Sequence, residues 1–165
     1  MAKLTRNLFV PLLDTSKGGA TPTWVPIDLS TIFELNFNPQ EETYGYICYA
    51  NDVTETNSYA PEMDQEIVLD NSNPMYKFMK EFCLGLPTGS SAKVPCLIAL
   101  PDDTTAQSTD GMLWQDAVVS PGALNTVDGK LTFTLKLNGD PQRGTVSGIG
   151  TDIVEFTRGN APQGD

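Results

Sequence analysis

Residues 130–137 carry the most regular pattern of apolar and polar side chains in this chain. Polar residues separate its apolar members, which are Leu131, Phe133, Leu135 and Leu137. Because successive side chains of a strand point to opposite faces of a sheet, this alternation predicts a β-strand. The preceding Asp128-Gly129 pair favours a two-residue hairpin turn. The pattern therefore constrains the chain to a fold that contains antiparallel sheet.

Other short segments also favour strands, because they are rich in β-branched and aromatic residues or partly alternate. They are 1–13, 24–27, 32–37, 44–49, 62–69, 93–100, 113–124, the segment that starts at the turn 138–146, and 152–158. Residues 1–13 and 24–27 are expected at an edge, the latter because Pro26 lacks a backbone donor. Polar loops are expected at 14–23, 51–59 and 102–111.

One segment has the period of a helix instead. Asn73 is suited to the N-cap, Pro74 to the first helical position, and Gly85 to the C-terminal stop. Residues on one face recur at helical spacing, and these are Met75, Phe78, Met79 and Phe82. The sequence predicts a helix over about residues 74–84 that packs on a sheet.

These elements together predict a mainly β protein. We expect roughly eight strands in an antiparallel β-sandwich or barrel-like pair of sheets, with one flanking α-helix. A length of 165 residues corresponds to one domain, 1–165. Within it, residues 1–23 are expected to form an N-terminal arm or loop, and 159–165 a flexible C-terminal tail.

Charge is distributed unevenly along the chain. There are 21 acidic and 10 basic residues, no histidine, and a formal net charge of −11. Residues 18–76 contain no Lys or Arg but ten Asp or Glu. Nucleophile systems that depend on histidine are excluded, and an acidic chain is unsuited to phosphate-wrapping or to anionic membranes. The acidic stretch is either a solvated surface that aids solubility or a surface that repels an anion.

No catalytic, cofactor-binding or metal-binding residues are expected. The pairs Glu41/Glu42 and Asp102/Asp103 offer neighbouring carboxylates, as glycoside hydrolysis requires, but adjacent strand residues point to opposite faces. We therefore expect no enzymatic activity. The three cysteines lack CxxC spacing and are each expected to be buried apolar residues of a chain made in a reducing cytoplasm. They are Cys48, Cys83 and Cys96.

The turn after residue 137 carries a family resemblance. Its members are Gly139, Asp140, Pro141, Gly144 and Thr145. Together with the segment that starts at Tyr59 and the helix at 73–84, this turn resembles the tail tube (major tail) proteins of long-tailed bacteriophages. The resemblance covers roughly residues 20–158 and rests on the order of elements and on these short stretches.

The resemblance implies a structural virion protein with a tail-tube fold. In that family, six subunits form a ring, their inner sheets join into one barrel, and stacked rings enclose a negatively charged conduit for DNA ejection. The implied partners are further copies of the chain, a tape measure protein inside the tube, and the tail terminator and distal tail or baseplate proteins. DNA would pass without specific binding, and no membrane would be bound. The implied location is the virion tail, assembled in the bacterial host cytoplasm.

The resemblance also suggests where particular residues lie. Acids that we expect to face the lumen are Glu34, Glu62, Asp64 and Glu66. Ring-to-ring contacts are expected from residues 1–23 and from the predicted polar loop, with candidates Asp52, Val53, Thr54, Glu55, Thr56 and Asn57. Both segments are expected there because they lack an apolar core of their own.

Two alternatives stay open at this point. The chain is equally suited to the inner tube of a contractile tail, a tailocin or a type VI-like injection system, since composition does not separate these from a flexible tail. A different class is a virion β-domain that acts as a binding module, for receptor binding or head decoration. Such a module would be monomeric or trimeric, with an exposed aromatic groove.

Overall fold

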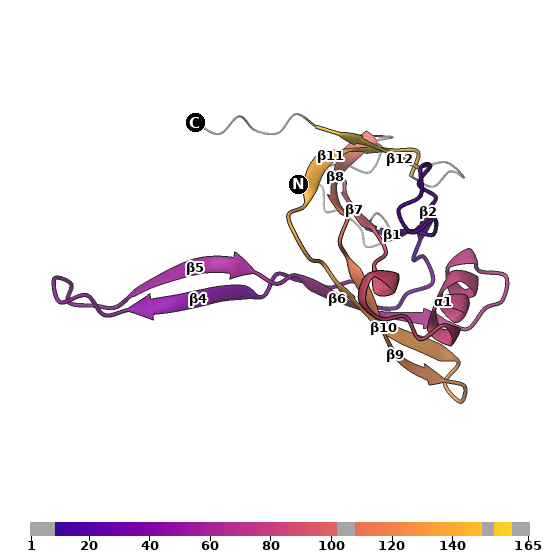
Figure 1. Cartoon of the computed structure of the whole chain (residues 1–165), viewed down its shortest axis with the longest axis horizontal. Coiled ribbons are helices and arrows are strands. Elements are labelled where there is room, and N and C mark those ends of the chain that lie inside the picture. Colours follow the sequence, from indigo (N-terminus) through magenta and orange to yellow (C-terminus); the bar gives the residue numbers. More distant parts are fainter. Residues whose placement is uncertain (1–8, 102–107, 150–153, 160–165) are drawn as a thin grey trace, which may run out of the picture.

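A computed structural model describes residues 9–101, 108–149 and 154–159. Within these ranges the chain forms three antiparallel sheets, of six, four and two strands, with one α-helix and a short 3-10 helix, Gly89–Ala92. Figure 1 shows a body that contains the two larger sheets and the helix, and a two-stranded hairpin that projects from it. The expected fold class, mainly β with antiparallel barrel-like sheets and one helix, is confirmed.

The six-stranded sheet is curled, and its strand order is β12-β11-β8-β7-β1-β2. The bounds are β12 Glu155–Arg158, β11 Gln142–Ser147, β8 Ser108–Trp114, β7 Cys96–Leu100, β1 Pro11–Asp14 and β2 Trp24–Pro26. The predicted strand near the N-terminus therefore lies inside the sheet, between β7 and β2, whereas β2 takes the expected edge. Residues 1–8 of the predicted N-terminal segment and residues 160–165 of the predicted tail lie outside the described ranges. Residues 102–107 of the predicted loop and residues 152 and 153 of the last predicted strand lie outside them too.

The four-stranded sheet has the order β3-β6-β10-β9. Its bounds are β3 Leu35–Asn36, β6 Glu62–Val68, β10 Lys130–Lys136 and β9 Val118–Asn125. The strands predicted at 62–69 and 130–137 are confirmed, whereas only two residues of the segment 32–37 pair as a strand. β9 tolerates the Pro121-Gly122 interruption because its register against β10 shifts there.

The predicted helix is confirmed as α1, Pro74–Leu84. The Asn73 side chain accepts a hydrogen bond from the Met75 backbone N–H at 2.8 Å, which satisfies one of the free donors of the first turn. Met75, Met79 and Phe82 are buried. They join one apolar core that lies between the two large sheets. A second, smaller apolar cluster lies on the other face of the six-stranded sheet.

The projecting hairpin, hereafter the arm, corrects two predictions. It consists of β4, Pro39–Tyr44, and β5, Val53–Tyr59, joined by a tip of residues 45–52. The strand predicted at 44–49 is this tip, because Gly45 follows β4 directly and the Tyr49 N–H closes a turn onto the Tyr46 carbonyl at 3.1 Å. The loop predicted at 51–59 is strand β5, because the main chain pairs with β4 even though both of its faces are polar.

The cysteine prediction is correct for Cys96, which is fully buried, and wrong for Cys48, which is exposed. Cys83 is half-buried. Cys48 escapes burial because the apolar run that contains it belongs to the tip of the arm and not to a core strand.

Candidate functional site

One face of the four-stranded sheet is polar, and it brings together three of the four predicted lumen residues. Glu62, Asp64 and Glu66 alternate along β6 with Met63, Gln65 and Ile67, which are buried. Because side chains alternate across a strand, the three acids share the outward face. Glu34, the fourth candidate, is exposed immediately before β3.

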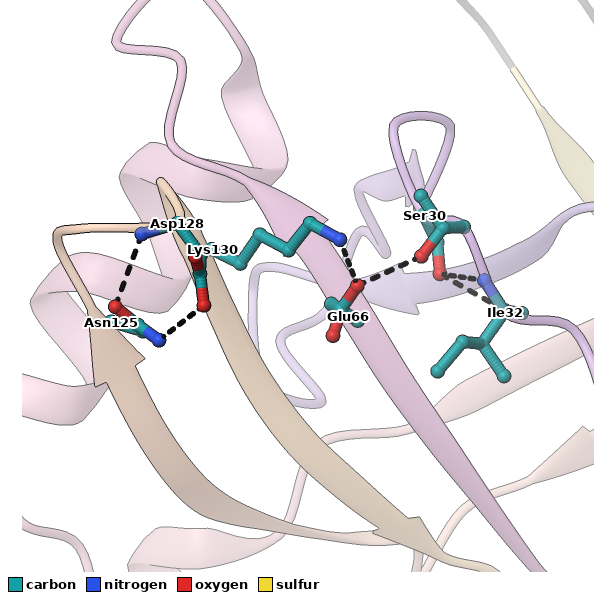
Figure 2. A network of polar contacts seen from close by, with 7 residues as sticks. Ser30, Ile32, Glu66, Asn125, Asp128 and Lys130 are labelled. Carbon is teal, nitrogen blue, oxygen red and sulfur yellow. Dashed lines mark hydrogen bonds and ion pairs between the residues drawn. The ribbon is translucent and has the colours of Figure 1, made fainter.

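The acids of this face are not without partners. Glu66 forms an ion pair with Lys130 of β10 at 2.7 Å and accepts a hydrogen bond from the Thr31 hydroxyl at 3.0 Å. Figure 2 shows Lys130 reaching across from β10 to Glu66. The Lys130 ammonium, followed by the Thr31 hydroxyl, lowers the pKa of Glu66, and the same carboxylate raises the pKa of Lys130. Asp64 accepts a hydrogen bond from the Thr134 hydroxyl at 2.7 Å.

The resulting face is mixed in sign. Lys136 is the direct cross-strand neighbour of Glu62, and Lys130 that of Val68. The hypothesis that these acids lack basic partners is therefore wrong for Glu66, whose partner lies 64 residues away in sequence. Glu62, Asp64 and Glu66 still outnumber the two lysines, so the face keeps a negative excess.

The densest unpaired charge lies on the arm. Residues 39–59 contain no Lys or Arg. They contain four acids, Glu41, Glu42, Asp52 and Glu55, all exposed. The Tyr44 hydroxyl donates to Glu42, which lowers the pKa of that carboxylate and raises the pKa of Tyr44. The predicted ring-to-ring residues lie here, with Asp52 in the tip and Val53, Thr54, Glu55, Thr56 and Asn57 in β5.

The tip of the arm is apolar and uncovered. Ile47 is fully exposed, Tyr49 is 62% exposed and Tyr46 is 46% exposed. Aromatic contacts hold them together, with 5.8 Å between the ring centroids of Tyr44 and Tyr46 and 6.1 Å between those of Tyr46 and Tyr49. The sequence analysis noted the aromatic residues of this run but predicted a strand at 44–49.

A hollow of about 960 Å³ lies at the root of the arm. Side chains from distant parts of the sequence line it, including Phe37, Tyr59, Met112 and Trp114 together with the turn 139–141. The Trp114 indole N–H is buried and has no acceptor among the described residues. The sequence analysis missed this hollow, because four separate segments create it. A second hollow, of about 590 Å³, lies beside the loop after β1 and includes Asp14, Trp24 and Phe156 in its lining.

The turn that carried the family resemblance is divided between two elements. Gly139, with a φ of 75°, lies in the turn with Asp140 and Pro141. Gly144 and Thr145 are strand residues of β11. Gly144 is required there by close packing, since an added Cβ would lie 2.2 Å from the Thr157 carbonyl oxygen of β12.

The described residues form neither a metal-binding cluster nor a membrane-spanning helix. No group of three or more His, Cys, Asp or Glu side chains in these ranges is arranged to hold a metal ion. No helix in them combines the length and the apolar character that crossing a bilayer would demand.

Comparison with known proteins shows a likeness of structure. No protein-family model matches the sequence, and no curated protein matches it either. A solved structure of the sheath/tube terminator of an extracellular contractile injection system, PVC, in its extended state has a TM-score of 0.55. The identity is 7%, over 88% of this chain and 97% of that chain.

Two structures from the anti-feeding prophage are also similar. A chain of its six-fold symmetrised baseplate has a TM-score of 0.53 and 11% identity, over 87% of this chain and 95% of that one. Its tube-terminating cap has a TM-score of 0.50 and 14% identity, over 90% and 93%. The chain has the fold of these injection-system components.

Proposed function

We propose that this chain is a structural subunit of a phage-tail-like tube, in which copies surround a channel with the polar face of the four-stranded sheet turned inward. The observation that carries the proposal is the form of that sheet: one face is packed on the core, the other is polar, and strand β9 forms one edge, where it is bridged on its outer side only at Val118, by Lys93, among the described residues. An unpaired edge strand is a template for pairing with another chain. The similar fold of injection-system components supports the same role.

Ring formation would satisfy the free edges of the sheet. β9 is eight residues long and its outer part is exposed, whereas β3 at the opposite edge has only two residues. Pairing of β9 with the opposite edge of a neighbour would continue the sheet around the channel and remove both edges. Six copies per ring are our expectation, supported by the six-fold symmetry of the similar baseplate.

The negative excess on the polar face suits a conduit for an anionic polymer such as DNA. Carboxylates repel phosphates, so a polymer would pass without condensing on the wall. In this role the single domain 1–165 would function in the virion tail after assembly in the host cytoplasm. Its partners would be further copies, a tape measure protein, a terminator and a baseplate. The origin of the similar structures favours the contractile version of such a tail.

A position at the end of a tube is the second candidate. Two of the similar structures are a sheath/tube terminator and a tube-terminating cap. A terminator would form one ring and stop, whereas a tube protein would stack rings without limit. Electron microscopy of the purified chain at increasing concentration separates the two, because only the tube protein gives hollow rods that grow in length.

The arm and the loop 15–23 are the proposed ring-to-ring contacts, whereas residues 11–14 of the predicted N-terminal segment are buried in β1 and do not qualify. Removal of the arm tests the proposal. Replacing residues 40–58 by Asn-Gly would join Pro39 to Tyr59, which are direct cross-strand neighbours. Since the side chains of 40–58 lie outside the apolar core, the body should keep its fold. We expect rings but no tubes by negative-stain microscopy, with an unchanged circular dichroism spectrum.

The control is the full chain, prepared in the same way, which should form tubes. Tubes of normal length from the shortened chain would refute the role of the arm. Monomers at all concentrations from the full chain would refute the proposed function itself.

A further inference from the structure

Residues 138–141, hereafter the link, lead from the four-stranded sheet to β11 of the six-stranded sheet. They contain the single Asn-Gly pair of the sequence, Asn138-Gly139. Leu137 is buried immediately before the link, and Gln142 begins β11 directly after it. All four residues of the link are exposed. The pair therefore lies in an open segment that is held at both ends.

The reacting groups of this pair are unpaired. The Asn138 carboxamide and the Gly139 N–H form no hydrogen bond with the residues that the structure describes. Gly139 has a φ of 75° and no Cβ, so no side chain of its own shields its nitrogen. An exposed carboxamide next to an unshielded and unpaired main-chain nitrogen meets the requirements of an intramolecular attack.

We infer that Asn138 is a site of spontaneous deamidation. The Gly139 nitrogen gives its proton to solvent and attacks Cγ of the Asn138 carboxamide. An N–Cγ bond forms, the Cγ–Nδ2 bond breaks, and Nδ2 takes a proton from solvent and leaves as ammonia. Water then opens the resulting succinimide at either of its carbonyl carbons, which gives aspartate or isoaspartate. Water is the only co-reactant of the sequence of steps.

The other asparagines of the described ranges each lack one of these conditions. Asn38 and Asn73 precede prolines, which have no N–H to lose. Asn125 uses both ends of its carboxamide: the oxygen accepts from the Val127 N–H at 3.0 Å, and the nitrogen donates to Asp128 at 2.7 Å. The remaining ones precede residues whose Cβ shields the attacking nitrogen, and these are Asn36, Asn51, Asn57 and Asn71.

Deamidation changes both the charge and the length of the link. Each event makes the formal net charge of −11 one unit more negative. A Cβ added to Gly139 would lie 3.7 Å from Oδ2 of Asp116, so that carboxylate lies beside the link, and Asp140 belongs to it. The product gathers a third carboxylate here, and isoaspartate adds one carbon to the main chain. Because Gly139, Asp140 and Pro141 line the hollow at the root of the arm, the hollow of an ageing subunit becomes more acidic.

The inference does not rest on the proposed function, because the reaction needs only the folded monomer. Peptide mapping of the dilute, purified full chain after incubation at pH 8 tests it. Trypsin cuts after Lys136 and Arg143, so residues 137–143 form one peptide whose only asparagine is Asn138. We expect this peptide to gain about 1 Da and to separate into two products, of which isoaspartate is methylated by protein isoaspartyl methyltransferase. Its rate should exceed that of any other described asparagine by about tenfold or more, since only glycine leaves the nitrogen unshielded.

Two variants are the matched controls, and a sample digested without incubation gives the background. Asn138→Gln keeps an exposed carboxamide but must form a larger, six-membered ring, so its peptide should keep its mass. Asn138→Asp carries the charge of the product and should elute with the acidic species of the unmodified chain on anion exchange. Since Asn138 is exposed, both variants should keep the circular dichroism spectrum of the unmodified chain.

Two results would overturn the inference. One is that Asn138 stays at the background in the folded chain; deamidation of the same chain in urea would then show that the folded link protects it. The other is that Asn51, Asn57 or Asn71 deamidates as fast as Asn138. Neither result bears on the proposed function, because tube formation is measured separately by microscopy.

Discussion

Asp14 is a buried carboxylate that organises the loop after β1. It is 1% exposed and accepts backbone hydrogen bonds from Ser16 at 2.9 Å, Gly18 at 3.0 Å and Thr23 at 2.9 Å. The Ser16 hydroxyl adds a fourth bond at 2.6 Å. The sequence placed Asp14 at the start of a polar loop but gave no sign of this role, because its donors follow it by two to nine residues.

Replacement of Asp14 by Asn should destabilise the protein by about 2–3 kcal/mol. The amide nitrogen cannot accept a hydrogen bond, and the charge that strengthens the remaining bonds is lost. Urea denaturation measures the change in the free energy of unfolding. Asp116→Asn is the control and should cost about 0–1 kcal/mol, since Asp116 is exposed and forms an ion pair with the exposed Lys93. Equal costs for the two variants would contradict the role assigned to Asp14.

The cysteines should differ in reactivity. Burial raises the pKa of Cys96 to about 12, whereas Cys48 is exposed at the tip. Because the thiolate is the reactive form, Cys96 should stay neutral and unmodified at pH 8 while Cys48 reacts. Mass spectrometry after iodoacetamide treatment of the folded monomer counts the labels at each position. Labelling of Cys96 as fast as Cys48 would show that the core is more open than described.

At the scale of elements, the sequence predicts best what depends on neighbours in the chain. The cap at Asn73 and the helical spacing of Met75, Met79 and Phe82 are local, and α1 lies where they indicate. The alternation at 130–137 likewise gives both the strand and its buried face. Strand β5 escaped prediction, because its hydrogen bonds go to β4 and its side chains carry no apolar pattern.

The sequence likewise predicted the parts of the candidate site that depend on local pattern and missed those that depend on distant segments. Alternation alone placed Glu62, Asp64 and Glu66 on one face, whereas the partner Lys130 comes from a strand far along the chain. The hollow at the arm root could not be predicted, because it exists only after distant segments meet.

Gly144 tests the packing of the C-terminal strands. In Gly144→Ala the new methyl group would lie 2.2 Å from the Thr157 carbonyl oxygen and 2.7 Å from the Phe156 ring, so β12 would have to move from β11. We expect a loss of about 1–3 kcal/mol, measured by thermal unfolding. Gly85→Ala is the control and should cost less, since Gly85 has a φ of −78° and an added Cβ would come no nearer than 3.6 Å to the Phe82 carbonyl oxygen. Unchanged stability of Gly144→Ala would show that β12 does not pack on β11 as described.

At the scale of the whole molecule, the structure combines a closed body with features that need other copies. The body buries one continuous core, whereas the arm is a two-stranded sheet with both faces exposed, a form that is marginal in isolation. The edge of β9 beyond its bridge at Val118 and the hollow at the arm root are further surfaces without an occupant among the described residues. With the arm, the edge of β9 and the hollow, the subunit has exposed surfaces that are suited to self-assembly.

The acids of residues 18–76, which follow one another in the sequence without a Lys or Arg, are spread over several surfaces of the folded molecule. The ten acids of residues 18–76 are divided between the arm, the polar sheet face and the loops around them. Those on the sheet are partly balanced by lysines, whereas those on the arm are not. Repulsion between arms would therefore oppose assembly, and salt should ease assembly by screening that repulsion.

A cryo-EM reconstruction of the assembled chain tests the central claim most directly. The account predicts closed rings in which β9 of each copy pairs with the opposite sheet edge of its neighbour and Glu62, Asp64 and Glu66 line the channel. Rings whose channel is lined by the six-stranded sheet, with those three carboxylates on the outer wall, would contradict it.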